Sequence, residues 1–297
     1  MFWREIVRLF HKEMVYLWGM SVLLFTLIVL SGAFLAGFVG SLTGLGGGVI
    51  IIPLLTLVLK VDIHYAIGAS IISVIATSSG SAAAYVKEGI TNVRIGMFLE
   101  IATTISAVVG AVVAVFIDPN YIAVIFGLVL LFSAITMIRK KKDRSDADTS
   151  DQLAVFFKLN GSYPEGAEFK SYAVHHVAGG FLMMFVAGIV SGMLGIGSGA
   201  LKVLAMDHIM KIPFKVSTTT SNFMMGVTGA ASAVVYFHRG QIDPGIAMPV
   251  ALGVLVGSTV GSGILMRVKT DRLKLVFAVV VIFLAGQMIY NGFIGTL

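Results

Sequence analysis

Apolar residues run through this chain in stretches too long for a water-soluble protein. The first stretch extends from Tyr16 to Leu59 without a charged residue, and further uncharged stretches follow it to the end. A helix needs about 20 consecutive apolar residues to cross the hydrocarbon core of a bilayer. The pattern therefore predicts an all-α polytopic membrane protein, and we expect it in the cell (inner) membrane as a multi-pass chain.

Polar residues divide the chain into four parts. Residues 1–15 mix charges with apolar residues at helical spacing, which predicts an interfacial amphipathic helix. Residues 16–138 form a first transmembrane repeat, and residues 173–297 form a second. Between them, residues 139–172 are expected to be a cytoplasmic loop in which Asn160-Gly161 indicates a small hairpin. The expected helices cover residues 16–42, 49–59, 64–85, 94–117, 121–138, 173–194, 200–210, 216–237, 245–266 and 273–294.

A glycine-rich motif interrupts the first apolar stretch at residues 37–48, and a motif of the same pattern lies at residues 188–199. Backbone that leaves a regular helix at membrane depth is tolerated where protein buries it or where it lines a cavity. Each motif therefore predicts a broken or re-entrant helix pair, in which a long helix is followed by a turn and a short helix. Close helix packing at glycine is the simpler alternative for any single glycine.

The two halves align at a shift of 151 residues without gaps. Between residues 34 and 138, 24 of 105 aligned pairs are identical, including Lys60 with Lys211 and Tyr85 with Tyr236. Apolar helices resemble one another by composition, but matches at Gly, Lys, Ser and Tyr in a constant register favour a true internal repeat.

The distribution of Lys and Arg indicates how the repeats are oriented. Five crossings per half, with the N-terminus outside, place 15 of these residues in the cytoplasm and 5 outside, whereas four crossings per half give 13 against 7. Lys and Arg concentrate in cytoplasmic loops. An odd number of crossings inverts the second repeat, so we expect two inverted repeats, each a broken or re-entrant helix pair plus three transmembrane helices.

Composition narrows the possible functions. Only 12% of residues are charged and none is cysteine, so no thiol nucleophile or cysteine metal site exists. The formal charge of +6 reports loop orientation and not a nucleic-acid partner. No carboxylate–histidine cluster indicates a metal, and no cofactor is implied. The expected partners are a small anionic substrate, the lipid bilayer and, as an option, a second copy in a homodimer.

Paired inverted repeats with broken helices are typical of secondary transporters that bind substrate between the halves. The free N–H groups and positive dipole ends of the short helices suit an anion. Hydroxyl-rich helices follow each break, with Ser73 in the first and Thr218 in the second, although interhelical or local hydrogen bonding explains many such side chains equally well. The candidate substrate-binding residues are Thr43, Gly46, Gly47, Gly48, Ser70, Thr77, Gly197, Ser198, Gly199, Lys202, Thr219, Thr220, Ser221 and Asn222.

Lys202 is the most specific of these candidates, because its repeat partner is the apolar Ile51. A lysine inside a membrane segment is costly, which makes a functional role the first hypothesis. Snorkelling or pairing with an acid is the structural alternative. We expect Glu100 at an interface rather than in a proton relay, and Asp207 in contact with water.

The two motifs, at residues 37–53 and 187–202, together with the Thr/Ser-rich residues 213–221, resemble the TauE/SafE sulfite exporter family, also called the toluene-sulfonate uptake permease family. The resemblance covers about residues 30–289. It implies a multi-pass carrier for sulfite, sulfonates, sulfoacetate-like compounds or related organosulfur anions. The charged N-terminus and the insert near residues 153–172 look like additions to the family pattern.

The residue patterns predict a secondary carrier for a small anion and not an enzyme, and the resemblance implies that this anion contains sulfur. An anion channel with the same site, or a permease for a non-sulfur organic anion, remains an alternative. A membrane enzyme has no nucleophile–base pair to support it, and a scaffold would leave the duplicated breaks without a role.

Overall fold

The computed structural model describes residues 21–138, 151–165, 168–265 and 271–295, and these are predominantly helical. The predicted interfacial helix at residues 1–15 lies outside the described residues. The first half comprises α2 (Val22–Thr43), α3 (Gly48–Pro53), the π-helical turn η1 (Leu54–Val58), α4 (Ile63–Lys87), α5 (Val93–Ala114) and α6 (Pro119–Ile138). The second comprises α8 (Val177–Leu194), α9 (Gly199–Leu204), the π-helical turn η2 (Ala205–Ile209), α10 (Phe214–His238), α11 (Pro244–Leu265) and α12 (Asp271–Ile294).

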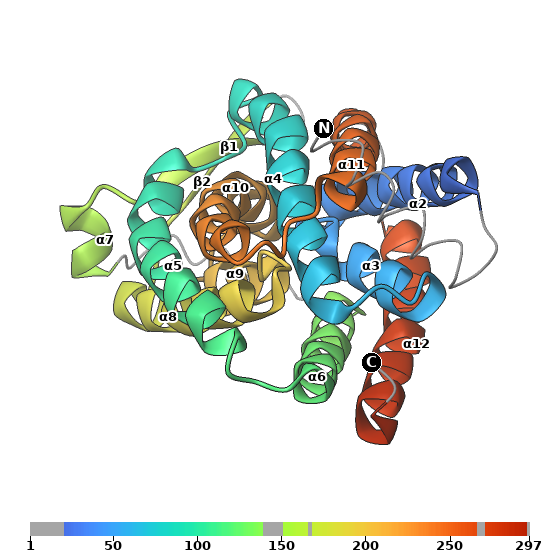
Figure 1. The fold of residues 1–297 in the computed structure, drawn as a ribbon. Helices are drawn as coiled ribbons and strands as arrows, with labels where there is room; N and C mark the ends of the chain where they lie inside the picture. Colours follow the sequence, from blue (N-terminus) through green and yellow to red (C-terminus); the bar gives the residue numbers. More distant parts are fainter. Residues whose placement is uncertain (1–20, 139–150, 166–167, 266–270, 296–297) are drawn as a thin grey trace.

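Within the described part of the chain, six helices are long and apolar enough to cross a membrane, namely α2, α4, α5, α6, α8 and α11. The predicted all-α polytopic membrane fold is therefore confirmed. Helix α10 matches α4 in length, with 25 residues each, but its first half is rich in Ser and Thr. Figure 1 shows α10 in the interior of the bundle, and it packs directly against α4 and α5.

The two halves pack against each other through equivalent pairs of helices. Helix α2 packs on α11, whereas α8 packs on α5, and both α4–α10 and α6–α12 are neighbours (Figure 1). Glycines permit the closest contacts, because a Cβ on Gly37 would lie 2.3 Å from the Val254 carbonyl oxygen. A Cβ on Gly188 would lie 2.5 Å from the Thr103 carbonyl oxygen, which is the same contact shifted by 151 residues. The internal repeat thus extends to tertiary contacts, while its inversion across a membrane stays a prediction.

The insert between the halves forms a short helix, α7 (Gln152–Phe156), and a hairpin of β1 (Gly161–Glu165) and β2 (Glu168–Tyr172). The predicted hairpin is present, but the prediction of its turn at Asn160-Gly161 is wrong, because these residues come at the start of β1. The Asn160 side chain instead accepts a hydrogen bond from the Val174 amide at 2.9 Å. Asn160 therefore links the two ends of the hairpin at its base and does not form the turn at its tip.

The hairpin is attached to the helical bundle through its buried side chains. Tyr163 and Tyr172 are buried in one apolar cluster with Ile95 of α5. The Asn92 side chain, which caps α5, donates to the Tyr172 hydroxyl oxygen at 2.8 Å. Burial raises the pKa of the Tyr172 hydroxyl above its usual value. The insert therefore packs against the first turns of α5 as a fixed part of the fold.

Candidate functional site

The predicted breaks are present in both halves, and they share their backbone geometry at two glycines each, although Ser198, with φ of 42°, differs from its partner Gly47, with φ of -68°. Helix α2 ends at Gly44, with φ of 73°, and α8 ends at Gly195, with φ of 65°. Gly46 and Gly197 follow with φ of 80° and 71°. Positive φ is accessible to glycine with little steric cost, which explains why these positions carry no side chain. The sequence patterns at residues 37–48 and 188–199 therefore encode two matching turns.

The two turns lie against one another at a buried point of the molecule. A Cβ on Gly199 would meet the Gly44 carbonyl oxygen at 1.9 Å, which no real side chain could do. A Cβ on Gly48 would lie 3.2 Å from the Ile196 Cα atom and 2.2 Å from the Ser70 hydroxyl oxygen. The glycines thus permit direct backbone contact between segments that lie about half the chain apart.

Side chains from α4 and α10 fasten the turns through equivalent hydrogen bonds. The Ser70 hydroxyl donates to the Gly195 carbonyl oxygen at 2.7 Å. Its repeat partner Ser221 lies 3.3 Å from both the Gly44 and the Gly199 carbonyl oxygens. Each half therefore holds the turn of the other half, so the centre of the molecule belongs to both repeats.

Two tyrosines further along α4 and α10 hold the helix ends that precede the breaks, each within its own half. The Tyr85 hydroxyl donates to the Ser41 carbonyl oxygen at 3.0 Å. The Tyr236 hydroxyl lies 3.1 Å from the carbonyl oxygens of Gly192 and Met193. These bonds satisfy carbonyls that the end of a helix leaves free, which buried helix ends require.

Not all candidates from the sequence contribute to this centre in the same way. The hydroxyls of Thr43 and Thr219 donate to carbonyls of their own helices, and Thr220 accepts from the Asn92 amide at the start of α5. The Thr77 hydroxyl accepts from the Gly47 amide at 3.2 Å and so supports the first break. The residues at or directly beside the two turns are Gly46, Gly47, Gly48, Ser70, Thr77, Gly197, Ser198, Gly199, Ser221 and Asn222.

Several buried polar atoms near the breaks have no hydrogen-bond partner within the described chain. They are Ser73 Oγ, Ser198 Oγ, Thr218 Oγ1 and Asn222 Oδ1. The Thr218 side chain lies against Gly44, and Ser73 lies beside the Gly47 backbone. Native proteins pair most buried polar groups, so a cluster of unpaired ones needs an explanation such as a bound ligand or water. The hydroxyls among them can donate to an oxyanion.

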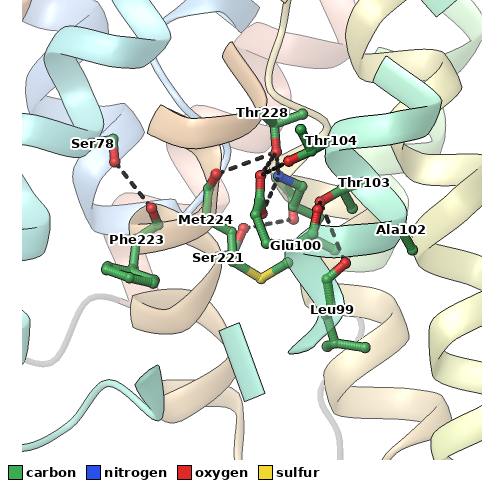
Figure 2. Close-up of polar contacts among 12 residues, drawn as sticks. Ser78, Leu99, Glu100, Ala102, Thr103, Thr104, Ser221, Phe223, Met224 and Thr228 are labelled. Atoms are coloured by element: carbon green, nitrogen blue, oxygen red, sulfur yellow. Dashed lines mark hydrogen bonds and ion pairs between the residues drawn. The ribbon is translucent and has the colours of Figure 1, made fainter. Parts of the chain in front are cut away.

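Lys202 is fully buried, with 0% of its surface exposed, and its ammonium group is not free. The Lys202 Nζ atom donates to Thr228 Oγ1 at 2.5 Å and lies 3.8 Å from Glu100 Oε2. Thr228 Oγ1 also lies 2.5 Å from Glu100 Oε1, to which Thr104 donates at 3.1 Å. Figure 2 shows Glu100 and Thr104 of α5 facing Thr228 of α10. The alternative in which Lys202 pairs with an acid is therefore what the structure contains.

Two expectations for acidic residues are wrong. Glu100 is only 6% exposed and belongs to the buried polar cluster, not to an interface. Its helix starts at Val93, but the hairpin insert covers the first turns and leaves Glu100 in the interior. Asp207 is 7% exposed and lies 3.2 Å from His208 Nδ1, so it is not open to water.

Sequence reasoning missed Glu100, and it left Thr218 out of the candidate binding residues although it favoured the hydroxyl-rich group at residues 218–222. Glu100 could have been found from its repeat partner, because Ala251 shows that the scaffold does not require an acid there. The same comparison had already singled out Lys202, whose partner is Ile51. Two asymmetric charges of opposite sign in apolar helices are a signal that they pair with each other.

A polytopic helical bundle with two glycine breaks meeting at a buried polar centre defines the chain as a membrane transporter. The chain belongs to the sulfite exporter TauE/SafE family, whose model matches residues 29–288. It is therefore a multi-pass protein of the cell membrane.

Curated relatives carry the same general description. A protein of Bacillus subtilis named "Probable membrane transporter protein YunE" is 28% identical over 275 residues, covering 90% of this chain and 98% of the relative. A "Probable membrane transporter protein" of Xylella fastidiosa is 25% identical, covering 90% and 95%. One of Methanocaldococcus jannaschii, MJ0441, is 24% identical, covering 86% and 92%. No solved structure matches the chain.

Proposed function

We propose that this protein is a secondary carrier for a small sulfur-containing anion such as sulfite, a sulfonate or a sulfoacetate-like compound, and that it has no enzymatic activity. The observation that carries the proposal is the set of unpaired buried hydroxyls where the two glycine breaks meet. Transporters built from repeats bind substrate at the interface of the repeats, where broken helices end.

The chemistry of this centre suits an oxyanion. Ser198 and Thr218 offer hydroxyl donors without adding negative charge, and Lys202 places a cation one turn beyond the second break. The first short helix continues through its π-helical turn from Gly48 to Val58, so the positive end of its dipole points back to the break. Three equivalent oxygens on a sulfonate or sulfite could accept from several of these donors together. The family description, a sulfite exporter, supports sulfur as the central atom.

A carrier explains the fold better than a channel. Each half holds the turn of the other, so rocking of one half against the other would open the centre alternately to each side of the membrane. A channel with the same site is the second candidate, and a permease for a non-sulfur organic anion is the third.

Counterflow in proteoliposomes tests the proposal. Vesicles are preloaded with unlabelled ethanesulfonate, and uptake of labelled ethanesulfonate or sulfite is followed against its gradient. A carrier shows saturable uptake with transient accumulation, whereas a channel shows flux without counterflow. Saturable uptake of a carboxylate but of neither sulfur anion would favour the third candidate and contradict ours.

Matched variants locate the site. Thr218→Val and Ser198→Ala each remove a hydroxyl that has no partner among the described residues. Each should therefore raise the half-saturating concentration about tenfold through loss of a hydrogen bond to a charged ligand. Ser258→Ala is the control, because that buried hydroxyl donates within its own helix to the Leu255 carbonyl oxygen. Equal behaviour of all three variants would place the substrate elsewhere.

A further inference from the structure

The pair of Lys202 and Glu100 occurs on one side of an otherwise repeated centre. The pair joins the two halves, and at the repeat-related positions the lysine is replaced by Ile51 of the first half and the glutamate by Ala251 of the second, while Thr228 is matched by Thr77. The fold can therefore be built with apolar residues at both charged positions. The pair must be retained for a reason other than the architecture shared by the two halves.

The pair is also poorly satisfied for a buried ion pair. Glu100 Oε2 accepts no hydrogen bond from the described part of the chain, and its distance of 3.8 Å from Lys202 Nζ is long. Removing two charges from water costs several kcal/mol per ion, and only good geometry with further hydrogen bonds offsets that cost. Ionisable residues inside membrane segments usually mark ion or proton pathways. The Lys202 and Glu100 side chains are therefore better suited to moving apart from each other than to stabilising the fold.

No other titratable group competes for Glu100 among the described residues that surround it. Helix α8, which packs on α5, contains no titratable side chain. On α10, Lys215 and His238 lie at the two ends, and Tyr236 is bonded to carbonyls of α8. In the segment from α9 to η2, Lys202 faces Glu100, whereas Asp207 pairs with His208. On α5 itself, Arg94 lies near the start and points to the Lys158 carbonyl oxygen.

We propose that Lys202, Thr228 and Glu100 form the proton-coupling site of the carrier, an inference that rests on the anion-transport function proposed above. In the structure, Glu100 lies beside Lys202 and neutralises its charge. An incoming anion takes the place of the carboxylate beside the ammonium group. Glu100, now buried without its cation, takes one proton from the aqueous side and becomes a neutral carboxylic acid.

The charges balance in this exchange. The empty site holds one ammonium and one carboxylate, and the loaded site holds one ammonium, one monovalent anion and one neutral acid. Only one O–H bond forms, and the proton comes from water. Both forms of the site have zero net charge. Neither form therefore leaves an uncompensated charge when the site is closed off from water during the transport cycle.

Thr228 is built to permit the change of partners. Its hydroxyl accepts from Lys202 and has two acceptors within reach, Glu100 Oε1 and the Met224 carbonyl oxygen at 3.2 Å. A hydroxyl donates one proton at a time. Rotation toward Met224 therefore releases Glu100 while the bond from Lys202 is kept.

The test uses full-length protein in vesicles that contain a trapped fluorescent pH indicator. Ethanesulfonate is the probe, because it stays ionised throughout the neutral pH range and any pH effect then belongs to the protein. We expect wild-type vesicles to acidify inside as the anion enters, and an inward proton gradient to drive accumulation. Glu100→Gln should lose both effects, and its counterflow should no longer depend on pH.

Glu88→Gln is the control for the chemical change, because Glu88 is exposed at the end of α4, and it should behave as wild type. Proton movement of wild-type size in Glu100→Gln, or none in wild type that shows counterflow, would overturn the coupling site alone. Absence of saturable uptake and counterflow in wild type would overturn the proposed function and the coupling site with it. Thermal unfolding of each variant checks that lost coupling is not lost folding; an unfolded Glu100→Gln would be replaced by Lys202→Met/Glu100→Gln, which removes both charges and should likewise move no protons.

Discussion

The two places that follow the glycine breaks share a backbone but differ in charge. In the first half, Ile51 and Thr77 lie beyond the break, and Thr77 supports the Gly47 amide. In the second half, Lys202 and Thr228 occupy the equivalent positions and reach Glu100. Backbone turns, serine bonds and tyrosine bonds repeat, whereas the charges do not. The difference separates what builds the fold from what is available for transport.

The largest effect on stability is expected at the contact between the two glycine breaks, which both halves share. Gly199→Ala places a Cβ against the Gly44 carbonyl oxygen, and backbone cannot yield as a side chain can. We expect a loss of about 3 kcal/mol or failure to fold, with a smaller loss for Gly48→Ala, which first meets the Ser70 hydroxyl. Thermal unfolding of the purified variants measures both.

Gly286→Ala in α12 is the control, because an added Cβ meets nothing within 4 Å there. Its stability should equal or slightly exceed that of wild type, since alanine is favoured over glycine inside a helix. A stable Gly199→Ala would show that the two breaks do not touch as described.

The next largest effect on stability is expected at Lys202 and Glu100, whose repeat partners are uncharged. Lys202→Ile leaves Glu100 buried without a cation, and Glu100→Ala leaves Lys202 without its anion, so each should cost about 3 kcal/mol. The double variant copies Ile51 and Ala251 and should recover most of that loss. A double-mutant cycle on unfolding free energies measures the coupling. Additive losses would mean that the two side chains do not interact.

A smaller difference is expected between the two matching threonines. Thr228→Val removes the hydroxyl between Lys202 and Glu100, and Thr77→Val removes the acceptor of the Gly47 amide. Each should cost about 1–2 kcal/mol as an unsatisfied buried polar group. Only Thr228→Val should alter the pH dependence of ethanesulfonate counterflow. The same alteration in Thr77→Val would remove the functional distinction between the halves.

The smallest effect belongs to the insert, which has no counterpart elsewhere in the repeat. Asp151 accepts hydrogen bonds from the Val177 and Leu153 amides, and these bonds lower the pKa of its carboxyl group below the usual value. A lowered pKa in the folded state contributes stability above the ordinary Asp pKa of about 4, and that contribution is lost as the pH falls through the lowered value.

Asp151→Ala should therefore speed hydrogen exchange at the Val177 amide at neutral pH, and the difference from wild type should shrink in acid. Asp118→Ala, which changes a similar cap in the first half, should leave that amide unaffected. Unchanged ethanesulfonate transport in both variants would show that the insert is separate from the anion site.

Sequence alone predicts the helical bundle because apolar runs, glycine turns and a constant 151-residue shift are all local or periodic features. It places the breaks well, since positive φ at Gly44 and Gly195 leaves a direct trace in residue type. It fails for Glu100 and Asp207, whose burial depends on packing by segments distant in the chain. It also cannot show which hydroxyls donate within their own helix, as those of Thr43 and Thr219 do, and which have no partner among the described residues, as that of Thr218 has none.

The most direct measurement is the number of protons taken up when ethanesulfonate binds to the purified protein. Titration calorimetry in buffers of different ionisation enthalpy gives that number without any transport assay. We expect about one proton per anion for wild type and none for Glu100→Gln, because uptake is linked to the change in the environment of that carboxylate. Binding to wild type without proton uptake, or equal uptake by both proteins, would contradict the role assigned to the buried pair.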